Sequence, residues 1–180
     1  MRIAWALLSL LCLFAPAARA QERRASLEHA GSVGLLVGLG PLYSTIVVAN
    51  CPSCGGTRVI NGFAGVLDLG GSIAVGAEGA ELTARLRLAR LWAAGGESLL
   101  LGFRRSFGVE EWKTYFEIEL EAMLRPTWLL GPRAVLGVMH DFSPVFGLYA
   151  EGGLAVDIGG GRRVGIDITF GAQARSFLLQ

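Results

Sequence analysis

The sequence predicts an all-β chain that closes into an antiparallel up-and-down transmembrane β-barrel of eight strands, with ten strands as the alternative. Hydrophobic residues make up 52% of the chain and charged residues only 17%, whereas soluble domains normally cover themselves with mixed charges. No stretch beyond residue 20 offers the run of about eighteen uncharged apolar residues that a membrane helix needs. Because only helices and closed barrels satisfy their backbone polar groups in lipid, these observations favour a barrel.

The N-terminal segment has the pattern of a signal peptide. Arg2 supplies a positive start, residues 3–14 are mainly apolar, and Ala18-Arg19-Ala20 is a small-x-small cleavage pattern. We therefore expect a cleaved signal peptide over residues 1–20, a short N-terminal tail over 21–30 and the barrel over 31–180.

The charge balance excludes a nucleic-acid partner of the usual basic kind. The chain has 16 basic and 15 acidic residues, and the predicted cleavage removes Arg2 and Arg19 but no acidic residue. The mature chain then carries one more acidic than basic residue, which is not the basic footprint of a nucleic-acid-binding protein.

Between the glycine pairs, apolar and polar residues alternate along the sequence with a period of two. Over residues 116–124 one parity is apolar, whereas the other carries Glu117, Glu119 and Glu121. A helix would scatter these glutamates around its surface, whereas a strand places them all on one face. The expected strands span residues 32–49, 58–77, 81–93, 98–107, 112–124, 133–142, 145–158 and 163–177.

The first two of these segments exceed the length that a membrane strand needs. Pro41 and the pair Gly70-Gly71 could split them, which would give ten strands. Either number is even, as an up-and-down barrel with both termini in the periplasm requires.

The polar faces carry both signs of charge, which suits a narrow lumen in which charges compensate one another. A soluble lipocalin-like barrel, which would have the apolar faces inside, is the alternative. The predicted lumen charge network consists of Arg85, Arg87, Arg104, Glu117, Glu119, Glu121, Glu151, Asp157, Asp167 and Arg175.

Aromatic residues gather near the predicted strand ends, where an aromatic girdle meets the membrane interfaces. The predicted girdle consists of Trp92, Trp112, Tyr115 and Trp128, and Phe107, Phe142 and Phe146 lie at similar positions.

The signal pattern at Ala18-Arg19-Ala20, the alternating segment 116–124 and the closing segment 164–177 together resemble the small outer-membrane β-barrel proteins of Gram-negative bacteria. The resemblance is one of architecture over the whole mature region, without a subfamily motif. It implies location in the outer membrane and, as partners, outer-membrane lipid and lipopolysaccharide.

Cys51 and Cys54 form a C-x-x-C pair in a glycine-bounded loop. They are the two cysteines left after signal cleavage, in an oxidising compartment. We predict a structural disulfide between Cys51 and Cys54; a metal or redox site is the alternative. No cofactor is predicted.

Two other clusters bear on function. His140, Asp141, Ser143 and Glu151 are the residues that could imitate a lipid A hydrolase, but His140 and Ser143 are three positions apart, and a shared strand face needs an even spacing. The run Gly159-Gly160-Gly161-Arg162-Arg163 predicts a turn with two exposed arginines, which could contact lipopolysaccharide phosphates.

The predicted function is that of a non-enzymatic outer-membrane β-barrel with a structural or interaction role. Eight strands leave an interior just wide enough for side chains to fill, so charged side chains would plug the lumen. The alternatives are a narrow channel or small-ligand carrier, a lipid A-modifying hydrolase, and the soluble periplasmic barrel.

Overall fold

The protein forms a closed barrel of eight antiparallel strands in a computed structural model. The structure describes residues 32–51, 56–75, 79–90, 96–109, 111–125, 127–143 and 145–177. The strands are β1 (Ser32–Cys51), β2 (Gly56–Ala74), β3 (Ala80–Arg90), β4 (Gly96–Val109), β5 (Trp112–Met123), β6 (Leu129–Ser143), β7 (Phe146–Gly159) and β8 (Gly161–Phe177).

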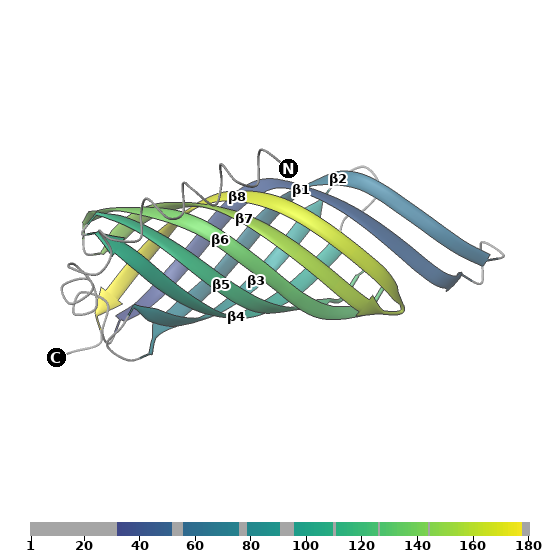
Figure 1. The fold of residues 1–180 in the computed structure, drawn as a ribbon, viewed down its shortest axis with the longest axis horizontal. Helices are drawn as coiled ribbons and strands as arrows, with labels where there is room; N and C mark the ends of the chain where they lie inside the picture. Colours follow the sequence, from purple (N-terminus) through teal and green to yellow (C-terminus); the bar gives the residue numbers. More distant parts are fainter. Residues whose placement is uncertain are drawn as a thin grey trace, which may run out of the picture.

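Each strand pairs with its neighbours in sequence, and β1 pairs with β8 to close the barrel. The closing ladder runs from Ser32 opposite Phe177 to Val48 opposite Gly161, so the start of β1 and the end of β8 lie at one end of the barrel. At the other end, β1 and β2 project beyond the other strands as a hairpin (Figure 1). Closure gives most backbone groups a ladder partner, as a bilayer requires.

The two long strands are not split, so the barrel has eight strands and not ten. Pro41 has no N–H to donate, and the β1–β8 register skips from Leu39 to Leu42 at this point. On its other side Pro41 still pairs with Gly65 of β2, so β1 continues. Gly70 and Gly71 likewise stay in register with Arg85 and Ala84, so β2 continues through them.

The outer face of the barrel is apolar and its interior is polar, which is the reverse of a soluble barrel. On β5, Phe116, Ile118 and Leu120 are exposed on the outer face, whereas Glu117 and Glu119 are buried inside. The other strands follow the same alternation. The soluble lipocalin-like alternative is therefore wrong, because it requires the apolar residues inside.

Within the described residues, no helix is long and apolar enough to cross a membrane.

Inward-facing glycines make room for large lumen side chains. Tyr115 pairs across the ladder with Gly137, and Tyr149 pairs with Gly171. A Cβ atom on Gly137 would overlap the ring of Tyr115, and one on Gly171 would overlap the ring of Tyr149. Both rings are therefore seated over the backbone of the next strand.

Replacing Gly137 by valine is expected to destabilise the barrel by about 1–3 kcal/mol, because it overpacks the site of the Tyr115 ring. Urea unfolding of the refolded barrel in detergent or lipid vesicles measures this change. Gly152→Val is the matched control, because a Cβ atom there meets only the Asp167 carbonyl oxygen, at 3.9 Å. Equal destabilisation by the two substitutions would contradict the seating of Tyr115 on Gly137.

Candidate functional site: the lumen charge network

Every strand except one contributes charged side chains to the interior of the barrel. β1 carries no charged residue, whereas β2 to β8 each place at least one buried charge inside. The ten residues predicted for the lumen are all buried. Together with other buried polar residues they form three groups along the barrel, which we call the central, far and near groups. Near and far refer to the end that holds the start of β1.

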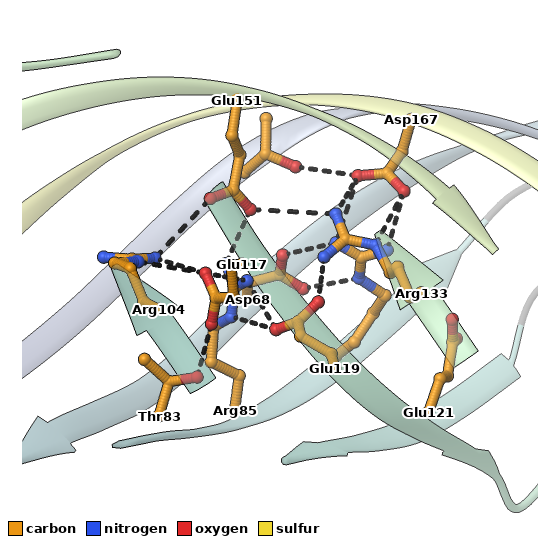
Figure 2. Close-up of polar contacts among 12 residues, drawn as sticks. Asp68, Thr83, Arg85, Arg104, Glu117, Glu119, Glu121, Arg133, Glu151 and Asp167 are labelled. Carbon is orange, nitrogen blue, oxygen red and sulfur yellow. Dashed lines mark hydrogen bonds and ion pairs between the residues drawn. The ribbon is translucent and has the colours of Figure 1, made fainter. Parts of the chain in front are cut away.

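The central group is organised around Arg85 of β3 (Figure 2). Its Nη1 donates to Glu151 Oε1 at 2.6 Å, its Nε to Glu119 Oε1 at 3.0 Å, and its Nη2 to Glu117 Oε2 at 3.2 Å. Arg104 donates to Glu117 Oε2 from Nη2 at 2.8 Å, and the Thr83 hydroxyl donates to the same carboxylate. One guanidinium therefore joins carboxylates from β5 and β7 across the lumen.

Arg133 of β6 and Arg87 of β3 extend the central group to β2 and β8. Arg133 Nη2 donates to Asp167 Oδ1 at 2.6 Å, and its Nη1 donates to Glu119. Arg87 holds Asp68 through two hydrogen bonds of 2.8 and 2.7 Å and reaches Asp167 Oδ2 at 3.1 Å. Such two-pronged arginine–carboxylate pairs are the stronger kind of ionic hydrogen bond.

The far group lies toward the end with the projecting hairpin. Arg163 Nη1 donates to Glu121 Oε1 at 2.7 Å and to Asp157 Oδ2 at 3.0 Å. Arg163 was predicted to be an exposed arginine of the turn 159–163, and that prediction is wrong. The ladder places Arg163 opposite Asp157 on inward-facing positions, whereas its neighbour Arg162 faces outward and is exposed.

The near group lies at the end that holds the start of β1. Lys113 Nζ contacts Asp141 Oδ2 at 2.6 Å, and Arg175 Nη1 donates to Asp141 Oδ1 at 2.9 Å. Gln173 accepts from Arg175 Nη2 at 3.1 Å and donates to Glu81 Oε2 at 3.3 Å. Asp141 is thus shared between cations from two strands.

Tyr115 does not belong to an aromatic girdle. It is 2% exposed and lies inside the barrel, where its hydroxyl donates to Glu151 Oε2 at 2.7 Å. The guanidinium of Arg104 lies 4.2 Å from the centre of its ring. The prediction considered only the distance of Tyr115 from a strand end, whereas its strand parity is that of Glu117 and therefore inward.

Trp112 and Trp128 are 62% and 57% exposed; Trp112 is the first residue of β5, and Trp128 directly precedes β6. Phe107, Phe142 and Phe146 are also exposed. Trp92 lies outside the described residues, as do Cys54, the side chain of Cys51 and residues 1–31. The predicted disulfide and signal peptide therefore stay predictions.

Sequence reasoning missed several buried charges. They are Asp68, Glu81, Lys113, Arg133, Asp141 and Arg163. Each one occupies an inward position of its strand, so strict parity along each segment would have found them. Arg133 was missed because the expected strand began at that residue, whereas β6 begins at Leu129.

Apolar layers border the central group on both sides. Leu36, Tyr115, Val135, Met139 and Tyr149 form a buried cluster toward the near group. Leu42, Ala64, Val66 and Ala89 form a second cluster on the far side of Asp68 and Arg87. A third cluster, of Ile46, Met123 and Leu129, lies beyond the far group. The interior is therefore packed along its length with side chains in alternating apolar and charged layers.

The arrangement does not assemble the catalytic geometry of a hydrolase. His140 faces outward, between the rings of Trp112 and Phe142, whereas Asp141 and Glu151 are buried inside. In a hydrolase of this kind the acid that orients the histidine base must lie within hydrogen-bond reach of it, which opposite faces of a strand do not allow. Among the described residues, no three His, Cys, Asp or Glu side chains gather as a metal site.

An outer face of apolar side chains around a charged interior defines the class of transmembrane β-barrels. Solved structures of transmembrane β-barrels have a similar fold. Neisserial surface protein A has a TM-score of 0.56 at 11% identity, covering 78% of this chain and 96% of its own. The N-terminal β-barrel domain of Pseudomonas aeruginosa OprF has a TM-score of 0.55 at 14% identity, covering 81% and 98%.

A de novo designed transmembrane β-barrel is similar to the same degree, with a TM-score of 0.55 at 16% identity, covering 81% of this chain and 96% of the design. At these identities the likeness concerns the fold. The predicted resemblance to small outer-membrane β-barrels is thus confirmed at the level of architecture. The chain matches no protein-family model and no curated protein.

Proposed function

We propose that the protein is a non-enzymatic outer-membrane β-barrel with a structural or interaction role, whose lumen is closed to solutes by its own side chains. The observation that carries this proposal is the packing of the central group. Arg85, Arg87, Arg104 and Arg133 are among the largest fully buried side chains, and each is held by carboxylates. An eight-stranded barrel has little interior space beyond that which side chains fill.

The outer surface of the barrel is suited to lipids as partners. The outer face is a continuous apolar band, as in barrels that contact acyl chains. Arg162 is exposed at the end remote from the start of β1. With an even number of strands and short periplasmic turns, this end would face outward. Arg162 suits a contact with a lipopolysaccharide phosphate, since guanidinium groups bind phosphate through paired hydrogen bonds.

Cell fractionation and gel mobility test the location. We expect the protein in the outer-membrane fraction, with the unboiled sample migrating faster than the boiled one because the closed barrel resists detergent. Recovery of soluble periplasmic protein without a mobility change would contradict the proposal.

Conductance in planar bilayers tests the closed lumen. We expect no conductance steps from the refolded protein, because the buried guanidinium and carboxylate groups leave no continuous water path. The variant Arg85→Ala with Glu119→Ala removes one base and one acid at mid-height and is expected to admit ions. Regular steps from the unmodified protein would show a channel instead.

A further inference from the structure

The outer face has a groove in the half of the barrel nearer the start of β1. The groove has a volume of about 620 Å³ and is bordered by residues of β1, β6, β7 and β8 and by Trp112 of β5. Ala150 pairs with Phe170 and Ala172 pairs with Leu148, so the two alanines are diagonal neighbours on the outer face. Because alanine side chains are short, they form the floor between larger apolar walls.

One end of the groove is polar. His140 borders the groove, and its ring centre lies 4.5 Å from that of Trp112 and 4.6 Å from that of Phe142. The Nδ1 atom of His140 is buried and has no hydrogen-bond partner among the described residues. Trp112 begins β5 and β6 ends at Ser143, so this end lies near the rim of the barrel. Aromatic rings at that level mark the lipid headgroup region.

We propose that this groove binds one glycerophospholipid of the periplasmic leaflet, with an acyl chain over Ala150 and Ala172 and the headgroup beside His140. This inference rests on the proposed location in the outer membrane. The volume lies within the range of about 300–1,000 Å³ that is usual for small-molecule sites. An apolar trough that ends in one imidazole between aromatic rings matches the division of a phospholipid into chain and headgroup.

The positions of the first and last strands indicate which leaflet of the outer membrane the groove faces. β1 starts and β8 ends at the same end of the barrel as His140. In even-stranded outer-membrane barrels this end, with its short turns, faces the periplasm. The lipid within reach of the groove is then a phospholipid of the inner leaflet and not lipopolysaccharide.

Native mass spectrometry of the refolded barrel, transferred from detergent containing phosphatidylethanolamine, tests the site. We expect one phosphatidylethanolamine to stay bound per barrel. The double variant Ala150→Leu with Ala172→Leu fills the floor and is expected to lower the affinity by about tenfold or more. His140→Phe keeps a ring between Trp112 and Phe142 but removes the polar atoms, and is expected to lower the affinity about two- to tenfold, as the loss of one hydrogen bond would.

Ala134→Leu is the matched control, because Ala134 is exposed on the outer face outside the groove. It is expected to leave the bound lipid unchanged. A series of adducts that is equally strong in all variants, or preferential retention of lipid A over phosphatidylethanolamine, would overturn the inference. A heat-modifiable barrel in the outer membrane without a retained phospholipid would overturn this site but not the proposed function.

Discussion

Replacing Arg85 by methionine is expected to destabilise the barrel by about 3–5 kcal/mol, since removal of one partner leaves buried charges uncompensated. Arg85 donates to Glu117, Glu119 and Glu151, and all four side chains are fully buried. Methionine fills much of the same volume, so the loss is mainly that of the charge. Equilibrium unfolding in urea, followed by tryptophan fluorescence in lipid vesicles, measures the change in the free energy of unfolding.

Arg125→Met is the matched control for this prediction. The side chain of Arg125 is 76% exposed and lies 3.8 Å from Glu97, so the substitution is expected to change stability by about 0–1 kcal/mol. Adding Glu119→Gln to Arg85→Met removes one of the stranded charges and is expected to restore part of the stability. If Arg85→Met and Arg125→Met unfold at the same urea concentration, the central group does not stabilise the barrel.

Introducing arginine at Ile118 is expected to cost about 2–4 kcal/mol, because it places a charge on the lipid face near the bilayer midplane. Ile118 is 55% exposed on the outer face, in the middle of β5, next to the inward Glu117 and Glu119. The same unfolding experiment in vesicles measures this cost. In a soluble barrel with solvent outside, the substitution would be close to neutral.

Ile158→Arg controls for depth. Ile158 is similarly exposed but lies one residue from the end of β7, where the cost of a charge falls to about 0–1 kcal/mol. A large difference between the two variants locates the apolar band of the bilayer on the strands. Equal and small costs would mean that the outer face does not contact lipid.

Alternation along single segments was enough to predict the fold and much of the candidate site. The eight charged residues predicted on β3, β4, β5 and β7, from Arg85 to Asp157, all lie inside, because side chains of one parity share a face whatever the strand pairs with. Errors arose where another argument replaced parity. Tyr115 was assigned by its closeness to a strand end, and Arg163 by its closeness to a glycine turn.

The sequence by itself determined that the chain alternates, where its strands lie and which face of each strand is charged, since these are local properties with a period of two. Only the tertiary structure decided which charges meet. Arg85 and Glu151 are 66 residues apart, and Arg87 and Asp167 are 80 apart. Their contacts depend on the register of every ladder between them and on the pairing of β1 with β8. Closure also decided that Pro41 interrupts one ladder without ending its strand, because the partner on the other side keeps β1 in place.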